Sequence, residues 1–208
     1  MMVAHKLKYE YGMKPLTACW APHIYTDVGW RNLQNMIHSG LDNVLGTPNG
    51  KVHRILTKLS LEKMGDVFQP FIYGQKAFPM QVAVKHKIPL VMYGENGEVE
   101  YGGSTETENN SLLSIDYQKK VWFEGGYDLV MSKIDYINPS DLYFWQFPNN
   151  EEIGDKELHT ATWSYFEPWD SYRNYVVAKE HCGLKEKEDS GNGTFTNFAQ
   201  NDQALYSL

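Results

Sequence analysis

Cysteine, positive charge and long apolar runs are all scarce in this chain. Its two cysteines, Cys19 and Cys182, lie far apart and form no Cys-x-x-Cys pair. A disulfide framework or structural zinc site is therefore not expected, no residues are assigned as metal ligands, and a reducing cytoplasm is the predicted setting. No stretch has the length and apolar character of a membrane span or a signal peptide. The net charge of -7 argues against a general nucleic-acid surface.

The chain does contain ample material for a core. Of its 208 residues, 42% are hydrophobic and 14% are aromatic, which is typical of a globular protein rather than a disordered one. The length suits one domain. We therefore expect a single α/β domain over 1–208, with a sheet-and-helix nucleotide half at 1–104 and an irregular, aromatic-rich half at 105–208 that binds substrate or a partner.

The first half alternates between apolar strand patterns and amphipathic helix patterns. Strands are expected at 16–20, 43–47 and 88–93. Helices are expected at 2–11, 27–39, 51–64 and 69–87, the last interrupted near Gly74 and Pro79. This alternation predicts parallel βαβ units, and hence a doubly wound parallel sheet in which the three strands are neighbours.

The second half is less regular. It begins with a polar loop or helix start over 106–114, and its other expected elements are short helices at 127–133 and 139–144, a strand at 160–166, a helix from Pro168 to about His181 and an exposed charged segment at 185–192. The aromatic residues Trp163, Tyr165, Phe166 and Trp169 suit a core or an interface, with stacking on a sugar as the alternative.

The most informative stretch follows the strand at 88–93. That strand runs into Gly94, Glu95 and Asn96, and then into Glu100, Tyr101, Gly102 and Gly103. Ligands of open α/β sheets bind beyond the carboxyl ends of the strands. Glycines there let the backbone approach a phosphate or a sugar, and the polar side chains supply hydrogen-bonding groups. The alternative is an ordinary turn, which the same residues also favour.

A second polar run lies near the end of the sequence. Thr194, Thr196 and Asn197 form part of a segment that belongs to no expected helix or strand. Hydroxyl and amide groups on a loop suit recognition of a sugar or a phosphate. Solvent-exposed loop polarity explains the same residues equally well.

Seven segments, taken in order, resemble one family. They are YGMKPL (11–16), YTDVGWRNL (25–33), FPMQVAVK (78–85), IPLVMYGEN (88–96), EYGG (100–103), YFEPWD (165–170) and GTFTNFA (193–199). Together they resemble the N-acetyl sugar amidotransferases of bacterial surface-polysaccharide and flagellin-glycan synthesis, which belong to the PP-loop ATP-pyrophosphatase superfamily.

The resemblance implies a fold of the adenine-nucleotide alpha-hydrolase type and an ATP- and Mg²⁺-dependent reaction. In that reaction an acetamido group of a glycan-precursor sugar becomes an acetamidino group, with ammonia from a glutaminase partner. Glu95 and Asn96 are then the catalytic candidates, while Gly94, Glu100–Gly103, Thr194, Thr196 and Asn197 are expected to bind nucleotide or substrate. Ammonia is expected from a separate glutaminase through a cyclase-like subunit that docks on 122–169.

One departure from the family is substantial. Such enzymes carry a Ser-Gly-Gly-x-Asp-Ser loop whose backbone N–H groups hold pyrophosphate, and this sequence contains no such segment. We therefore expect a truncated form of the enzyme, incomplete at both ends, that binds ATP weakly. The alternatives are a non-catalytic sugar- or partner-binding module, or another superfamily branch such as a tRNA-thiolating enzyme.

Overall fold

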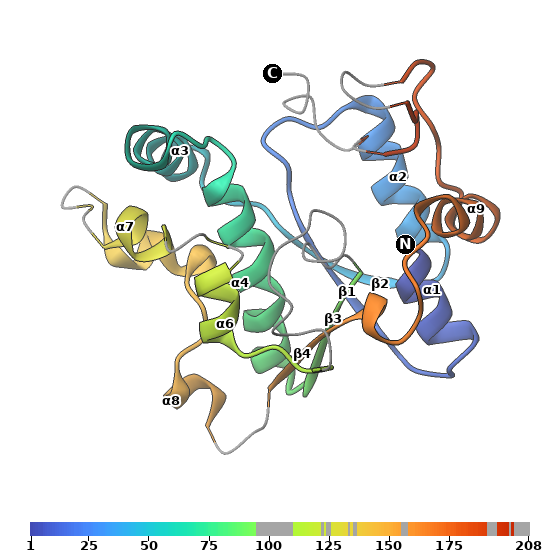
Figure 1. Cartoon of the computed structure of the whole chain (residues 1–208), viewed down its shortest axis with the longest axis horizontal. Helices are drawn as coiled ribbons and strands as arrows, with labels where there is room; N and C mark the ends of the chain where they lie inside the picture. Colours follow the sequence, from blue (N-terminus) through green and yellow to red (C-terminus); the bar gives the residue numbers. More distant parts are fainter. Residues whose placement is uncertain are drawn as a thin grey trace. The chain divides into compact units, whose positions relative to one another are not determined.

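The computed structural model describes residues 1–94, 110–121, 123, 126–132, 134, 137–154, 158–190, 195–199 and 201 (Figure 1). The chain divides into two compact units. The first, here called the terminal unit, combines Met1–Leu45 with Trp169–Leu208. The second, here called the central unit, is Gly46–Pro168.

The terminal unit joins segments from both ends of the chain. Its elements are α1 (Met2–Tyr9), β1 (Leu16–Trp20), α2 (Asp27–His38), most of β2 (Asp42–Gly46) and α9 (Ser171–Cys182). Strands β1 and β2 pair in a two-stranded sheet, and α2 connects them. Thr26 starts α2 because its hydroxyl accepts a hydrogen bond from the Gly29 amide at 2.9 Å. Helices α1 and α2 both pack against α9.

The central unit is built around one long buried helix. Its elements are α3 (Gly50–Met64), α4 (Gln69–His86), β3 (Leu90–Tyr93), α6 (Ile115–Val121), α7 (Tyr127–Met131), η1 (Pro139–Trp145), α8 (Asn150–Ile153), β4 (His159–Thr162) and η2 (Trp163–Tyr165). Helix α4 contacts α3, η1 and β3, which places it in the middle of this unit (Figure 1). The largest fully buried side chains include Trp145, Tyr73, Phe123, Leu56 and Met80, and all of them belong to the central unit.

Strands β3 and β4 pair in parallel although they lie far apart in the sequence. The register aligns Leu90 with His159 and Tyr93 with Thr162. An antiparallel bridge adds Leu113 beside β4, where the Leu113 amide donates to the Thr160 carbonyl at 2.8 Å. The Gln118 side chain, which is fully buried, donates to the Thr160 hydroxyl at 2.9 Å. Backbone and side-chain hydrogen bonds therefore both hold β4 in place.

The mixed α/β class is confirmed, together with its short parallel strand pairs. The predicted neighbourhood of the three strands is not seen, because within the described residues β1 pairs with β2 while β3 pairs with β4. The partner of β3 comes from the second half of the sequence, and local patterns do not reveal such a long-range pairing.

Three local predictions are corrected. Helix α4 continues through Gly74 and Pro79, because its burial stabilises the helix at a position where proline removes one backbone hydrogen bond. The strand expected over 160–166 ends at Thr162, and a 3₁₀ turn follows. Helix α6 lies where no helix was predicted. Within the described residues, no helix has both the length and the apolar character needed to cross a bilayer.

Candidate functional site at the carboxyl ends of β3 and β4

The parallel pairing brings two segments together at one edge of the central unit. Strand β3 ends at Tyr93 and continues into Gly94, while β4 ends at Thr162 and continues into η2. Tyr93 and Thr162 are register partners, so both strands end at the same level. In parallel sheets this edge is the usual place for a ligand.

Tyr93 anchors the β3 side of the edge. Its hydroxyl donates to the Lys76 carbonyl at 2.9 Å, and the Lys76 ammonium lies 4.3 Å from the centre of the Tyr93 ring. Burial raises the pKa of the Tyr93 hydroxyl well above its usual value. Tyr93 therefore stays neutral and holds the strand end in place, rather than acting as a proton acceptor.

Glu167 is fixed on the β4 side. The buried Trp163 indole donates to a Glu167 carboxylate oxygen at 3.0 Å, and the Glu167 amide donates to the Trp163 carbonyl at 3.2 Å. Both hydrogen bonds are local, since the two residues lie four positions apart. The 3₁₀ turn after β4 therefore holds a carboxylate beside the strand end.

Two aromatic rings next to Glu167 face solvent. Tyr165 is 45% exposed and Phe166 is 58% exposed, and their ring centres lie 5.2 Å apart in an edge-to-face arrangement. The Ser164 hydroxyl between Trp163 and Tyr165 is buried and has no hydrogen-bond partner in the described part of the chain. Aromatic faces beside a carboxylate and a hydroxyl suit a molecule that has both apolar faces and hydroxyl groups, as a sugar ring does.

The structure describes only three of the predicted site residues. Gly94 lies at the edge just described, directly after β3, and is partly buried. Thr196 and Asn197 belong to the terminal unit. The others fall outside the described residues: Glu95, Asn96, Glu100, Tyr101, Gly102, Gly103 and Thr194. Their predicted roles in catalysis and binding stay predictions.

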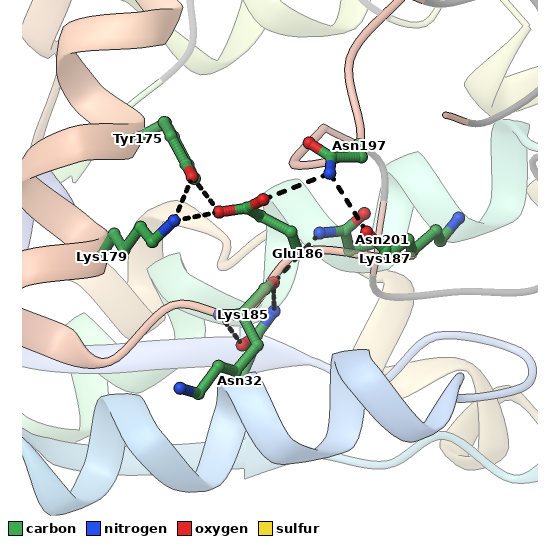
Figure 2. Close-up of polar contacts among 8 residues, drawn as sticks. All are labelled: Asn32, Tyr175, Lys179, Lys185, Glu186, Lys187, Asn197 and Asn201. Carbon is green, nitrogen blue, oxygen red and sulfur yellow. Dashed lines mark hydrogen bonds and ion pairs between the residues drawn. The ribbon is translucent and has the colours of Figure 1, made fainter. Parts of the chain in front are cut away.

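Asn197 takes part in a hydrogen-bond network of the terminal unit (Figure 2). Its amide nitrogen lies 3.2 Å from a Glu186 carboxylate oxygen and 3.2 Å from the Lys187 carbonyl. The Lys187 amide donates to the Asn197 carbonyl at 2.9 Å. These contacts join Asn197 to residues 186 and 187, which follow α9 in the sequence. The Asn197 side chain therefore stabilises the fold of this segment.

Glu186 is the centre of that network. Figure 2 shows its carboxylate accepting hydrogen bonds from the Tyr175 hydroxyl and the Lys179 ammonium, both on α9. The hydrogen bond from Lys179, followed by that from Tyr175, lowers the pKa of Glu186. Hydrogen bonds to Glu186 and Tyr175 raise the pKa of Lys179. The network thus holds the segment after α9 against that helix, with Glu186 and Lys179 in their ionised forms.

Sequence reasoning did not single out Glu167 as a site residue. Two signals were available: the Trp163-x-x-x-Glu167 spacing, and the place of Glu167 inside the segment YFEPWD. The aromatic residues for which a core, an interface or sugar stacking was predicted differ in their exposure. Trp163 is buried, whereas Tyr165 and Phe166 are exposed.

Metal ligands are not assigned at this edge. Among the residues that the structure describes, no three His, Cys, Asp or Glu side chains gather closely enough to bind a metal ion. No protein-family model and no curated protein matches this sequence. The resemblance to the sugar amidotransferases therefore stays a prediction from the sequence.

Proposed function

We propose that this chain forms part of an ATP-dependent amidotransferase that converts an acetamido group of a bacterial glycan-precursor sugar to an acetamidino group. One observation supports this most directly. The parallel pairing of β3 with β4 brings Tyr93 and Gly94 of the family-like segment IPLVMYGEN to the sheet edge after which the second such segment, YFEPWD, begins. A shared edge is what two segments of one substrate site require.

The proposal gives the described residues binding and positioning roles. The exposed rings of Tyr165 and Phe166 cover apolar C–H faces of the sugar, and the Glu167 carboxylate accepts hydrogen bonds from its hydroxyl groups. The Trp163 indole keeps that carboxylate oriented. Glu95 and Asn96, which follow Gly94 in the sequence, remain the proposed catalytic residues.

ATP, when bound, would activate the amide oxygen as a leaving group, and ammonia would then supply the nitrogen that replaces it. The proposal includes a separate glutaminase and a cyclase-like subunit as the ammonia source, with 122–169 as the docking surface. It also includes a cytoplasmic location and a doubly wound arrangement of the strands. We assign no step to Mg²⁺, because no described residues at this edge form a ligand set.

Turnover with labelled ammonia tests the proposal. A protein that carries this region together with a Ser-Gly-Gly-x-Asp-Ser loop is incubated with Mg-ATP, ¹⁵N-ammonium and a panel of nucleotide-linked and nonulosonic acetamido sugars, and mass spectrometry follows replacement of the amide oxygen by ¹⁵N. AMP should form in equal amount. Glu95→Ala, Asn96→Ala and Glu167→Gln should each lower turnover at least about tenfold, equivalent to ~1.4 kcal/mol of transition-state stabilisation. Glu62→Gln, a change at an exposed carboxylate of α3, is the matched control.

A binding module without catalysis is the second candidate. The absence of a Ser-Gly-Gly-x-Asp-Ser segment from the 208 residues favours it, because backbone N–H groups of that loop would hold the phosphates. Calorimetry separates the two functions. Sugar binding without AMP formation, together with weak Mg-ATP binding, supports the module, whereas micromolar Mg-ATP affinity contradicts the expected weak binding.

A further inference from the structure

A cavity of about 340 Å³ lies at the other, amino-terminal edge of the β3–β4 pair. It is formed by the end of α4, the residues just before each strand, and α8. Its lining residues are Ala83, Val84, Lys87, Ile88, Pro89, Ile153 and Leu158. The volume falls at the small end of the range that holds small molecules in proteins.

Lys87 is the polar side chain of an otherwise apolar lining. The backbone around it is already hydrogen-bonded, since the Ile88 amide donates to the Ala83 carbonyl at 2.8 Å and the Lys87 amide donates to the Val84 carbonyl at 3.2 Å. Pro89 has no N–H group, and its carbonyl accepts from the His159 amide at 2.8 Å. A ligand in this cavity therefore meets apolar side chains and Lys87, a residue that is exposed to solvent.

The backbone of Lys87 has an unfavourable conformation for lysine. With φ at 58° and ψ at 39°, it ends α4 in the left-handed region, and it is the sole non-glycine residue with positive φ in the described part of the chain. Glycine takes this position at most such helix ends, and a side chain there costs on the order of 1 kcal/mol. A lysine at a place that favours glycine points to a use for its side chain.

Among the described residues, no carboxylate neutralises the Lys87 ammonium, since no ion pair joins Lys87 to an acidic side chain. Among the acidic residues of α8, Glu152 accepts a hydrogen bond from the Asn149 amide at 2.8 Å and so completes its own capping box. Its neighbour Glu151 is exposed to solvent.

From these observations we propose that the cavity binds a small amphiphilic anion. An apolar chain or ring fills the space between α4 and α8, and a carboxylate head pairs with Lys87. The site is separate from the carboxyl edge. The four residues of β3 span about 13 Å between the two edges, so the anion is an additional ligand and not the sugar substrate.

Octanoate is a suitable probe, and protein NMR is the readout. Titration of the chain with millimolar octanoate should shift the amide and methyl signals of Val84, Ile88 and Ile153 in a saturable way. Octanol, which has the same apolar chain without the charge, should bind about three- to fivefold more weakly, since an exposed ion pair contributes that much. Octylamine, with the opposite charge, should bind more weakly still.

Four variants separate specific binding from general association. Lys87→Gln should weaken octanoate binding to the level of octanol, whereas Lys85→Gln, at an exposed lysine outside the lining, should leave it unchanged. Val84→Phe fills the cavity and should abolish the shifts, with Ile153→Phe as a second filling variant if the first does not fold.

Some outcomes overturn the proposal. Unsaturable shifts spread over the chain, or equal affinity of the wild type and a folded cavity-filling variant, would show that the cavity is not the binding site. Equal affinity for octanoate and octanol, or no loss in Lys87→Gln, would show that the site does not select an anion. None of these measurements depends on amidotransferase activity.

Discussion

The interactions that stabilise the terminal unit internally differ in kind from those that stabilise the central unit internally. In the terminal unit, asparagine side chains bridge segments from opposite ends of the sequence. The Asn32 amide donates to the Lys185 carbonyl at 3.0 Å and its oxygen accepts from the Lys185 amide at 2.7 Å, while Asn35 donates to the Gly183 carbonyl at 2.7 Å. In the central unit, the largest buried side chains are aromatic and aliphatic, with Trp145 and Tyr73 foremost.

This difference determines which amino-acid substitutions each unit tolerates. A hydrogen bond needs donor and acceptor in a set geometry and contributes about 1 kcal/mol, so the terminal unit depends on the identity of a few amides. Apolar packing depends on buried volume and shape, so the central unit depends on large side chains and accepts replacements of similar size. The four predictions below test this contrast in order of decreasing effect.

The largest effect is expected from truncating the core of the central unit. Trp145 is 0% exposed, its carbonyl accepts a hydrogen bond from the Tyr127 hydroxyl at 2.9 Å, and its ring meets the His53 ring at 5.7 Å. Trp145→Ala should lower the free energy of unfolding by about 3–5 kcal/mol through lost packing and a cavity. Urea denaturation, monitored by circular dichroism, measures this change in the free energy of unfolding.

The matched control is a tryptophan of the terminal unit. Trp30 is 47% exposed on α2, and Trp30→Ala should change the free energy of unfolding by no more than about 0.5 kcal/mol. Equal losses of unfolding free energy in Trp145→Ala and Trp30→Ala would contradict the proposed difference between the two units.

A smaller effect is expected from one amide of the terminal unit. Asn32→Ala removes both hydrogen bonds to Lys185 and should cost about 1–3 kcal/mol. Hydrogen exchange should show faster exchange at the Lys185 amide, with central-unit amides unchanged. Gln34→Ala removes a side-chain amide from the same helix and is the control. Loss of protection throughout the central unit would show that the two units unfold as one.

The third prediction concerns pH and a stacked histidine pair. The rings of His5 on α1 and His181 on α9 lie 4.4 Å apart with planes 12° from parallel. Burial, followed by the charge of His181, lowers the pKa of His5, while Glu10 raises it. The folded state therefore disfavours the protonated form, and stability of the terminal unit should fall as pH drops below the ordinary histidine value of about 6.5.

Thermal unfolding between neutral and mildly acidic pH measures this trend. His181→Gln should reduce the loss of stability at low pH, because it removes the charge that, after burial, lowers the pKa of His5. His86→Gln, at an exposed histidine of the central unit, should leave the pH dependence unchanged. A profile that His181→Gln does not alter would contradict the role given to the pair.

The smallest effect is expected for the Glu186 network. Glu186→Gln removes the charge that attracts Lys179, and hydrogen exchange in 185–190 should become faster, with a weaker dependence on salt. Global stability should hardly change, because the Lys179–Glu186 ion pair is partly exposed to solvent. The exposed Lys58–Glu62 pair on α3, at 3.7 Å, supplies the control variant Glu62→Gln. Unfolding of the whole terminal unit in Glu186→Gln would show that the network matters more than expected.

Local signals were enough to predict most of the first half. The helices expected at 27–39 and 51–64 lie within one residue of α2 and α3, which begin after the capping residues Thr26 and Asn49. The strands at 16–20 and 43–47 lie within one residue of β1 and β2. These features depend on side chains that act on their own neighbourhood, so their positions follow from the order of residues.

The candidate site could be predicted only in part. Gly94 was placed correctly at the end of a buried strand, because an apolar run followed by Gly-Glu-Asn is visible in the sequence. Glu167 was missed, because the edge that β4 shares with β3 depends on a pairing across more than sixty residues of sequence. The Asn197 contacts depend in the same way on how the segment after α9 folds back onto that helix.

By itself, then, the sequence determined the mixed α/β class and most helices and strands of the first half, because apolar periodicity and end caps act over a few residues. The tertiary structure alone decided which strands pair and which amides bridge distant segments. Those outcomes depend on contacts whose free energies are settled only when distant residues are packed together, and no local pattern encodes the choice of partner.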